Sequence, residues 1–214
     1  MSRLRLGVAL LVPQPIDREV DALRRACCDG SLGRVPPHVT LVPPVNVREE
    51  RLGEALGMLR AAGAASRPLR LTLGPPVTFL PANPVLYLAI WGDLGPLEEL
   101  RGRVFTGPLE RSLSWPFVPH VTLVDDGEPD RVRAGVRALA GYRAEVVVER
   151  LTLLHEQRDD AGRRVWRPLA DAALAAPAVI GRGGLELELA VSERLDPEVA
   201  TWMDTTWAAH TRSQ

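Results

Sequence analysis

Pro37-His38-Val39-Thr40-Leu41-Val42 recurs without change as Pro119-His120-Val121-Thr122-Leu123-Val124. The two copies are 82 residues apart, from position 38 to position 120. An exact repeat of this length within one chain suggests that two related halves make up the fold, so the same offset should align other elements as well.

The segments around the repeat align in the same way. Residues 3–9 fall on residues 85–91, and both stretches are apolar and typical of strands. Residues 70–73 (Arg-Leu-Thr-Leu) recur as residues 150–153, at an offset of 80. Each half therefore has the predicted order strand, helix, His-Val-Thr-Leu strand, helix, strand.

The helices of this order are predicted from apolar residues at helical spacing and from acidic residues near helix starts. They are expected over residues 17–29, 48–60, 93–105 and 130–140. A hairpin turn is expected at residues 158–163, between strands at 145–154 and 165–169.

These elements predict an α+β protein with a pseudo-twofold, bilobal arrangement. Two similar βαβ-type halves, about 1–80 and 81–172, are expected to place antiparallel sheets around a central cleft. Together they would form one domain over residues 1–172. Residues 173–184, rich in Ala, Pro and Gly, are expected to be a linker, and residues 185–214 a C-terminal strand–helix extension.

Composition excludes several classes of function. All 26 basic residues are arginine, so lysine Schiff-base chemistry and a P-loop lysine are excluded. The formal net charge of −1 gives no global attraction to nucleic acid or to an anionic membrane. Two adjacent cysteines cannot build a disulfide framework, no apolar stretch approaches a membrane span, and the start lacks a signal-peptide cleavage site. We expect a cytoplasmic protein that does not bind membranes.

The repeated motif predicts acid–base chemistry. In a strand, residues i and i+2 share a face, so His38 lies with Thr40 and His120 with Thr122. If the two strands meet at a twofold axis, two imidazoles and two hydroxyls converge on one cleft. One neutral histidine can then accept a proton and one protonated histidine can donate a proton during attack on a phosphodiester. The threonine hydroxyls can hydrogen-bond the phosphoryl oxygens, and no metal or cofactor is required.

The alternative is that His-Val-Thr-Leu is only a strand, which is the usual meaning of a single copy. Symmetry could also preserve a core strand. It would not explain why the polar His and Thr positions recur on the same face, so the repeat favours catalysis.

On these residues the sequence resembles the 2H phosphoesterase superfamily, which is named for two His-x-Thr-x motifs, and its 2′-5′ RNA ligase or RNA 2′,3′-cyclic phosphodiesterase branch. The resemblance covers about residues 3–170. It implies a bilobal fold and metal-independent hydrolysis of a 2′,3′-cyclic phosphate, on an RNA end or a nucleotide, to a 2′-phosphomonoester. It also implies that His38 and His120 are acid and base, in an order that the sequence leaves open, and that Thr40 and Thr122 bind phosphate.

One departure from the family concerns the second motif. Relatives in the ligase branch often carry a basic residue shortly after it, whereas here Asp125 and Asp126 follow. Two carboxylates at the cleft would repel a long polynucleotide. A 2′-5′ RNA ligase remains an alternative, as does a non-catalytic nucleotide- or RNA-binding module. The intact His and Thr pairs argue against the binding module.

Four further residues are candidates for substrate binding. Arg34, four residues before His38, is a candidate phosphate contact, although a solvated loop arginine is an equal alternative. Phe79, Trp115 and Phe117 are candidates for stacking on a base, and for each a place in the core is the alternative. No cluster of metal ligands is evident, so no metal site is predicted.

Overall fold

The computed structural model describes residues 2–176 and 178–182. The strands are β1 (Arg3–Leu11), β2 (His38–Arg48), β3 (Leu69–Thr78), β4 (Leu86–Trp91), β5 (His120–Val124), β6 (Ala144–Val148), β7 (Arg150–Arg158), β8 (Arg164–Ala173) and β9 (Val179–Gly181). The α-helices are α1 (Ile16–Ala26), α2 (Leu52–Ala64), α3 (Gly95–Val104) and α4 (Pro129–Ala138), and short 3₁₀ turns lie at Glu49–Arg51 and Gly107–Leu109.

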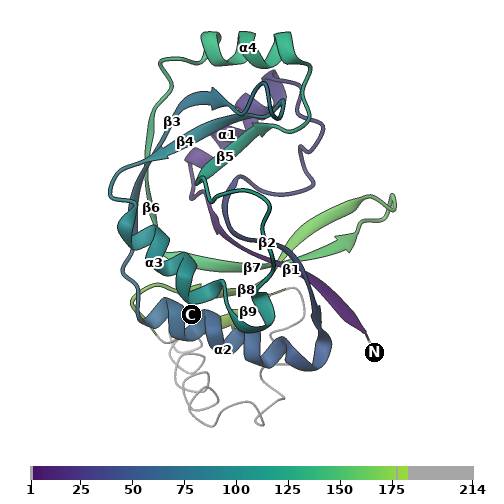
Figure 1. Ribbon diagram of the computed structural model, residues 1–214, viewed down its shortest axis with the longest axis vertical. Helices are drawn as coiled ribbons and strands as arrows, with labels where there is room; N and C mark the ends of the chain where they lie inside the picture. Colours follow the sequence, from purple (N-terminus) through teal and green to yellow (C-terminus); the bar gives the residue numbers. More distant parts are fainter. Residues whose placement is uncertain (1, 177, 183–214) are drawn as a thin grey trace, which may run out of the picture.

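All described strands belong to one antiparallel sheet with the order β6-β3-β4-β5-β2-β1-β7-β8-β9. In Figure 1, α4 and α1 lie in the upper part of the molecule, and α3 and α2 lie in the lower part. Helix α1 packs against β5 and α4 against β3 and β4, whereas α2 packs against β7, β8 and α3. The predicted α+β class with antiparallel pairing is confirmed.

The predicted order of elements holds with one correction, because β1-α1-β2-α2-β3 is followed by β4-α3-β5-α4-β6-β7. The single strand expected over residues 145–154 is two strands, β6 and β7, which pair with β3 and with β1. The pairing adds a feature that the repeat did not show. Strand β3, from the first sequence half, pairs with β4 and β6, whereas β7, from the second half, pairs with β1 and β8. The two sequence halves therefore exchange their third strands.

The repeated motifs meet at the centre of the sheet, where β2 pairs with β5 antiparallel through Val39 and Val121. These two valines are at equivalent positions of the two repeats, so the pseudo-twofold axis passes between them. Strands β3, β4, β5 and β6 lie on one side of this junction and the other five strands on the other side.

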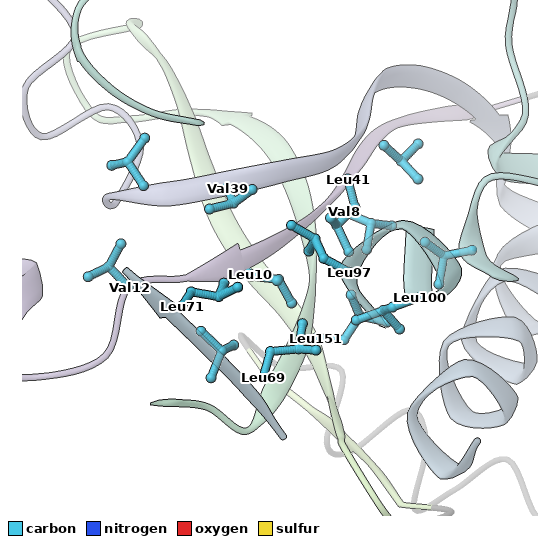
Figure 2. Close-up of a cluster of buried hydrophobic side chains, with 14 of the residues drawn as sticks. Val8, Leu10, Val12, Val39, Leu41, Leu69, Leu71, Leu97, Leu100 and Leu151 are labelled. Atoms are coloured by element: carbon cyan, nitrogen blue, oxygen red, sulfur yellow. The ribbon is translucent and has the colours of Figure 1, made fainter. Parts of the chain in front are cut away.

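A single hydrophobic core spans the junction. Figure 2 shows Val8 and Leu10 of β1, Leu41 of β2, Leu71 of β3 and Leu151 of β7 in one cluster. Leu97 and Leu100 of α3 close this cluster from the side. Strands on both sides of the β2–β5 junction, which are the two lobes, share this core. Neither lobe can therefore bury its apolar surface without the other.

The C-terminal part differs from the prediction over its described residues. Instead of a linker over 173–184, β9 pairs with β8, and Leu174 and Val179 belong to the core. The apolar residues among the alanines explain the difference, because they add one more strand to the sheet edge. The predicted extension over 185–214 lies outside the described residues. Within residues 2–176 and 178–182, no helix is both long and apolar enough to cross a membrane.

The exchanged strands should make unfolding cooperative. Leu71 on β3 and Leu151 on β7 are equivalent in the repeat and both buried. Leu71→Ala and Leu151→Ala should each lower the free energy of unfolding by about 2–5 kcal/mol, the usual cost of a core cavity. Urea unfolding followed by far-UV circular dichroism and by tryptophan fluorescence should give one coincident transition for each variant. Two separate transitions would contradict a shared core.

Candidate active site

The pairing of β2 with β5 brings the four motif residues together. Val39 opposes Val121 and both point into the core. In an antiparallel pair this register sets His38 opposite Thr122 and Thr40 opposite His120, on the other face of the sheet. All four side chains are half-buried. One patch at the centre of the sheet thus carries two imidazoles and two hydroxyls, as the sequence predicts.

Both imidazoles are tied to the backbone in the same way. The Nδ1 atom of His38 lies 2.7 Å from the carbonyl oxygen of Pro36, and that of His120 lies 2.6 Å from the carbonyl oxygen of Val118. A carbonyl oxygen only accepts, so Nδ1 carries the proton in each neutral ring, and Nε2 keeps the free lone pair.

The proline of each motif explains this geometry. Pro37 and Pro119 follow directly after the two accepting residues, and a residue before proline is confined to extended conformations. That restriction sets the direction of the accepting carbonyl group. The proline at each repeat is therefore part of the histidine's support, a role that the sequence pattern alone did not reveal.

The two histidines differ in their electrostatic surroundings. Burial, joined by the hydrogen bond to Pro36, which opposes it, and by the charges of Arg24 and His120, which act with it, lowers the pKa of His38 to about 4. Burial also lowers the pKa of His120, but there the hydrogen bond to Val118 and the charge of Asp125 oppose the shift. His38 is therefore held neutral, and the carboxylate of Asp125 favours the protonated form of His120.

Arg24 on α1 supports His38 through the loop that precedes it. Its guanidinium is 3% exposed and forms an ion pair with the fully buried Asp29 at 2.9 Å. The same guanidinium donates to the carbonyl oxygens of Ser31, at 3.2 Å, and Val35, at 2.9 Å. Residue 35 directly precedes the proline that accepts from His38, so Arg24 holds the backbone on which the imidazole is supported.

Two aromatic residues pack against His120. The Phe79 ring meets the imidazole edge-on, with centroids 5.4 Å apart, and stacks on Tyr87 at 4.2 Å. The Tyr87 ring lies 5.1 Å from the imidazole. Phe79, predicted as a base-stacking residue, is thus beside the paired motif residues, and Tyr87 joins it because β4 pairs with β5 through Tyr87 and Thr122. Only knowledge of that pairing could have found Tyr87.

The other predicted binding residues lie apart from the patch or have other partners. The Phe117 ring lies under the guanidinium of Arg101, 4.5 Å from the centroid, and packs on the core. Trp115 is 76% exposed on the loop before β5. Arg34 is exposed, and its Nε donates to the carbonyl oxygen of Arg164 at 3.1 Å. No ligand contact for these three follows from their positions.

A small pocket opens beside His38 and Thr40. It has a volume of about 120 Å³, and Gly7, Leu154 and Trp166 line it together with these two motif residues. Sequence reasoning missed Trp166, which lies on β8 within the predicted hairpin and carries no motif of its own. In the part of the chain that the structure describes, no three His, Cys, Asp or Glu side chains are grouped as metal ligands.

The Arg24 network gives a testable prediction. Arg24→Met should lower the free energy of unfolding by about 3–5 kcal/mol, because the buried carboxylate of Asp29 loses its partner. Arg51→Met is the control, since Arg51 forms an exposed pair with Glu54 and its loss should change stability little. Urea titration of both variants measures the difference. Equal stability of the two would contradict a structural role for Arg24, whereas partial recovery in Arg24→Met/Asp29→Leu would support it.

Comparison with known proteins agrees with this geometry. Residues 12–160 match a family model described as the 2′-5′ RNA ligase superfamily. A protein of Oceanobacillus iheyensis named as a candidate phosphoesterase is 27% identical over 155 residues, covering 72% of this chain and 90% of its own length.

Solved structures show the same fold. The crystal structure of E. coli LigT complexed with 3′-AMP is 26% identical, with a TM-score of 0.57, and covers 81% of this chain and 99% of its own. The complex of E. coli LigT with ATP superposes with a TM-score of 0.58 at 24% identity, with the same coverage. On its matching family model, its fold and its paired His-x-Thr strands, this chain belongs to the 2′-5′ RNA ligase superfamily of 2H phosphoesterases.

Proposed function

We propose that this protein is a metal-independent phosphodiesterase that hydrolyses 2′,3′-cyclic phosphates, at RNA ends or on nucleotides, to 2′-phosphomonoesters. The observation that carries the proposal is the pair of equivalent imidazoles. Each is held through Nδ1 by a backbone carbonyl group, and each leaves Nε2 for proton transfer beside a threonine of the opposite strand.

In the proposed reaction, a water molecule attacks phosphorus while one Nε2 takes its proton. The bond from phosphorus to O3′ breaks, and the other imidazolium gives its proton to O3′. The products are a 2′-phosphomonoester and a free 3′-hydroxyl. Thr40 and Thr122 donate hydrogen bonds to the non-bridging oxygens, where charge accumulates.

The surroundings of the two histidines favour one assignment of roles. His38 is neutral at physiological pH because its pKa lies near 4, so it suits the general base. His120 has the carboxylate of Asp125 nearby, which stabilises its imidazolium, so it suits the general acid. The anionic substrate adds to that stabilisation when it binds.

Two observations favour a nucleotide-derived substrate over a long polynucleotide. LigT is a relative crystallised with 3′-AMP and with ATP. In this chain, Asp125 and Asp126 are exposed beside the His120 side of the site and would repel a chain of phosphates.

Hydrolysis of 2′,3′-cyclic AMP in EDTA tests the proposal. His38→Ala and His120→Ala should each lower kcat at least about a hundredfold, the usual scale of general acid–base catalysis. The matched control is His155→Ala, because His155 lies on β7 outside the patch. Retained activity in both motif variants would rule out the two-histidine mechanism.

A substrate with sulfur in place of the bridging O3′ separates the two roles, because a thiolate leaves without protonation. His120→Ala should recover most of its activity on this substrate, whereas His38→Ala should stay inactive. The reverse pattern would exchange the acid and the base.

A further inference from the structure

The pocket beside His38 has the composition of a ring-binding site. Its lining combines His38 and Thr40 with the Trp166 indole and with apolar residues that include Gly7, Ala9 and Leu154. Its volume of about 120 Å³ is small compared with pockets that enclose whole drug-sized ligands. It therefore suits one flat ring system attached to a group held by the histidine.

Gly7 lies in close contact with the Trp166 side chain. A Cβ atom at this position would lie 3.3 Å from the carbonyl oxygen of Val42 and 3.6 Å from Cζ3 of Trp166. The indole therefore lies close to the β1 backbone, and it occupies space that a larger side chain at position 7 would need. A glycine in the middle of a strand usually marks a close approach of this kind.

The equivalent region next to His120 has different surroundings. At the repeat offset of 82, Arg5 and Gly7 correspond to Tyr87 and Ala89. The Tyr87 ring contacts the His120 imidazole there, and Phe79 stacks on Tyr87. The pseudo-symmetric site is thus asymmetric in its surroundings, and room for a ring exists beside His38.

The lining offers few groups that could read the edge of a base. Among the described lining residues, polar side-chain atoms come only from His38, Thr40 and the indole N–H of Trp166. Stacking on an aromatic face is tolerant of base identity, because every base has such a face. The pocket should therefore hold purines and pyrimidines with similar affinity.

We propose that this pocket is a base-stacking subsite, and that Trp166 binds the nucleobase of the nucleotide that carries the cyclic phosphate. The inference rests on the proposed cyclic phosphodiesterase function. It adds that the enzyme is specific for cyclic phosphates that carry a nucleobase, and that this base binds on the His38 side.

The test compares 2′,3′-cyclic AMP and 2′,3′-cyclic UMP with ribose 2,3-cyclic phosphate, which lacks a base. Trp166→Ala should raise KM for both nucleotides about tenfold, within the range that stacking contributes in alanine substitutions, and leave their kcat nearly unchanged. Values for the base-free substrate should not move. Trp166→Phe should keep most of the affinity, because it keeps an aromatic face.

Arg167→Ala is the matched control. Arg167 follows Trp166 on β8 and points to the opposite face, so its loss tests for disturbance of the strand. It should behave as the unmodified protein on all three substrates. If Trp166→Ala raises KM equally for substrates with and without a base, the stacking subsite is wrong.

A binding measurement separates this inference from the proposed function. If the unmodified protein hydrolyses none of the three substrates, the proposed function fails, and calorimetric titration with 2′-AMP and with inorganic phosphate still tests the subsite. Loss of 2′-AMP affinity in Trp166→Ala with phosphate affinity retained supports it. Equal loss of both, or no loss of 2′-AMP affinity, overturns it.

Discussion

The pairing of β2 with β5 at Val39 and Val121 is the contact on which the rest of the molecule depends. It joins the two sides of the sheet, and on its core face the two valines contribute to a hydrophobic cluster that both lobes share. On its other face it fixes which histidine opposes which threonine. A one-residue shift of this strand pairing would turn the imidazoles into the core. The burial of apolar side chains on one face therefore fixes the positions of the histidines and threonines on the other face.

The backbone supports both imidazoles in the same way, whereas the charges around the two imidazoles differ. Proline, backbone carbonyl and Nδ1 recur at both motifs and define the same tautomer. The neighbouring charges differ, with Arg24 affecting His38 and Asp125 affecting His120. The aromatic contacts differ as well, since Phe79 and Tyr87 pack on His120 while a pocket opens beside His38. The two histidines of a symmetric pair of strands therefore have different surroundings, as a reaction with separate acid and base roles requires.

Much of the fold and of the candidate site could be predicted from the sequence, because the repeated motif indicates two equivalent halves. The exact recurrence of the motif gave the order of elements and placed His and Thr on one face. The strand exchange was not predictable, since residues 69–78 and 150–158 are both apolar strands. Their sequences do not indicate which strands they pair with. Tyr87 was missed for the same reason, because it reaches the site through the pairing of β4 with β5. Trp166 lies in the predicted hairpin, but that hairpin reaches the site through the pairing of β7 with the distant strand β1. The strand at Val179–Gly181 was hidden in a stretch whose alanines, prolines and glycines are typical of a linker.

The tautomer and placement of the two imidazoles can be measured directly by two-bond ¹H–¹⁵N correlation spectra of the histidine rings at neutral pH, with His38→Gln and His120→Gln used for assignment. We expect both rings to be neutral and protonated at Nδ1, and we expect both Nε2 resonances to shift when inorganic phosphate or 2′-AMP is added. A neutral ring protonated at Nε2 instead of Nδ1, or a response of only one ring to the ligands, would contradict two imidazoles acting on one phosphate.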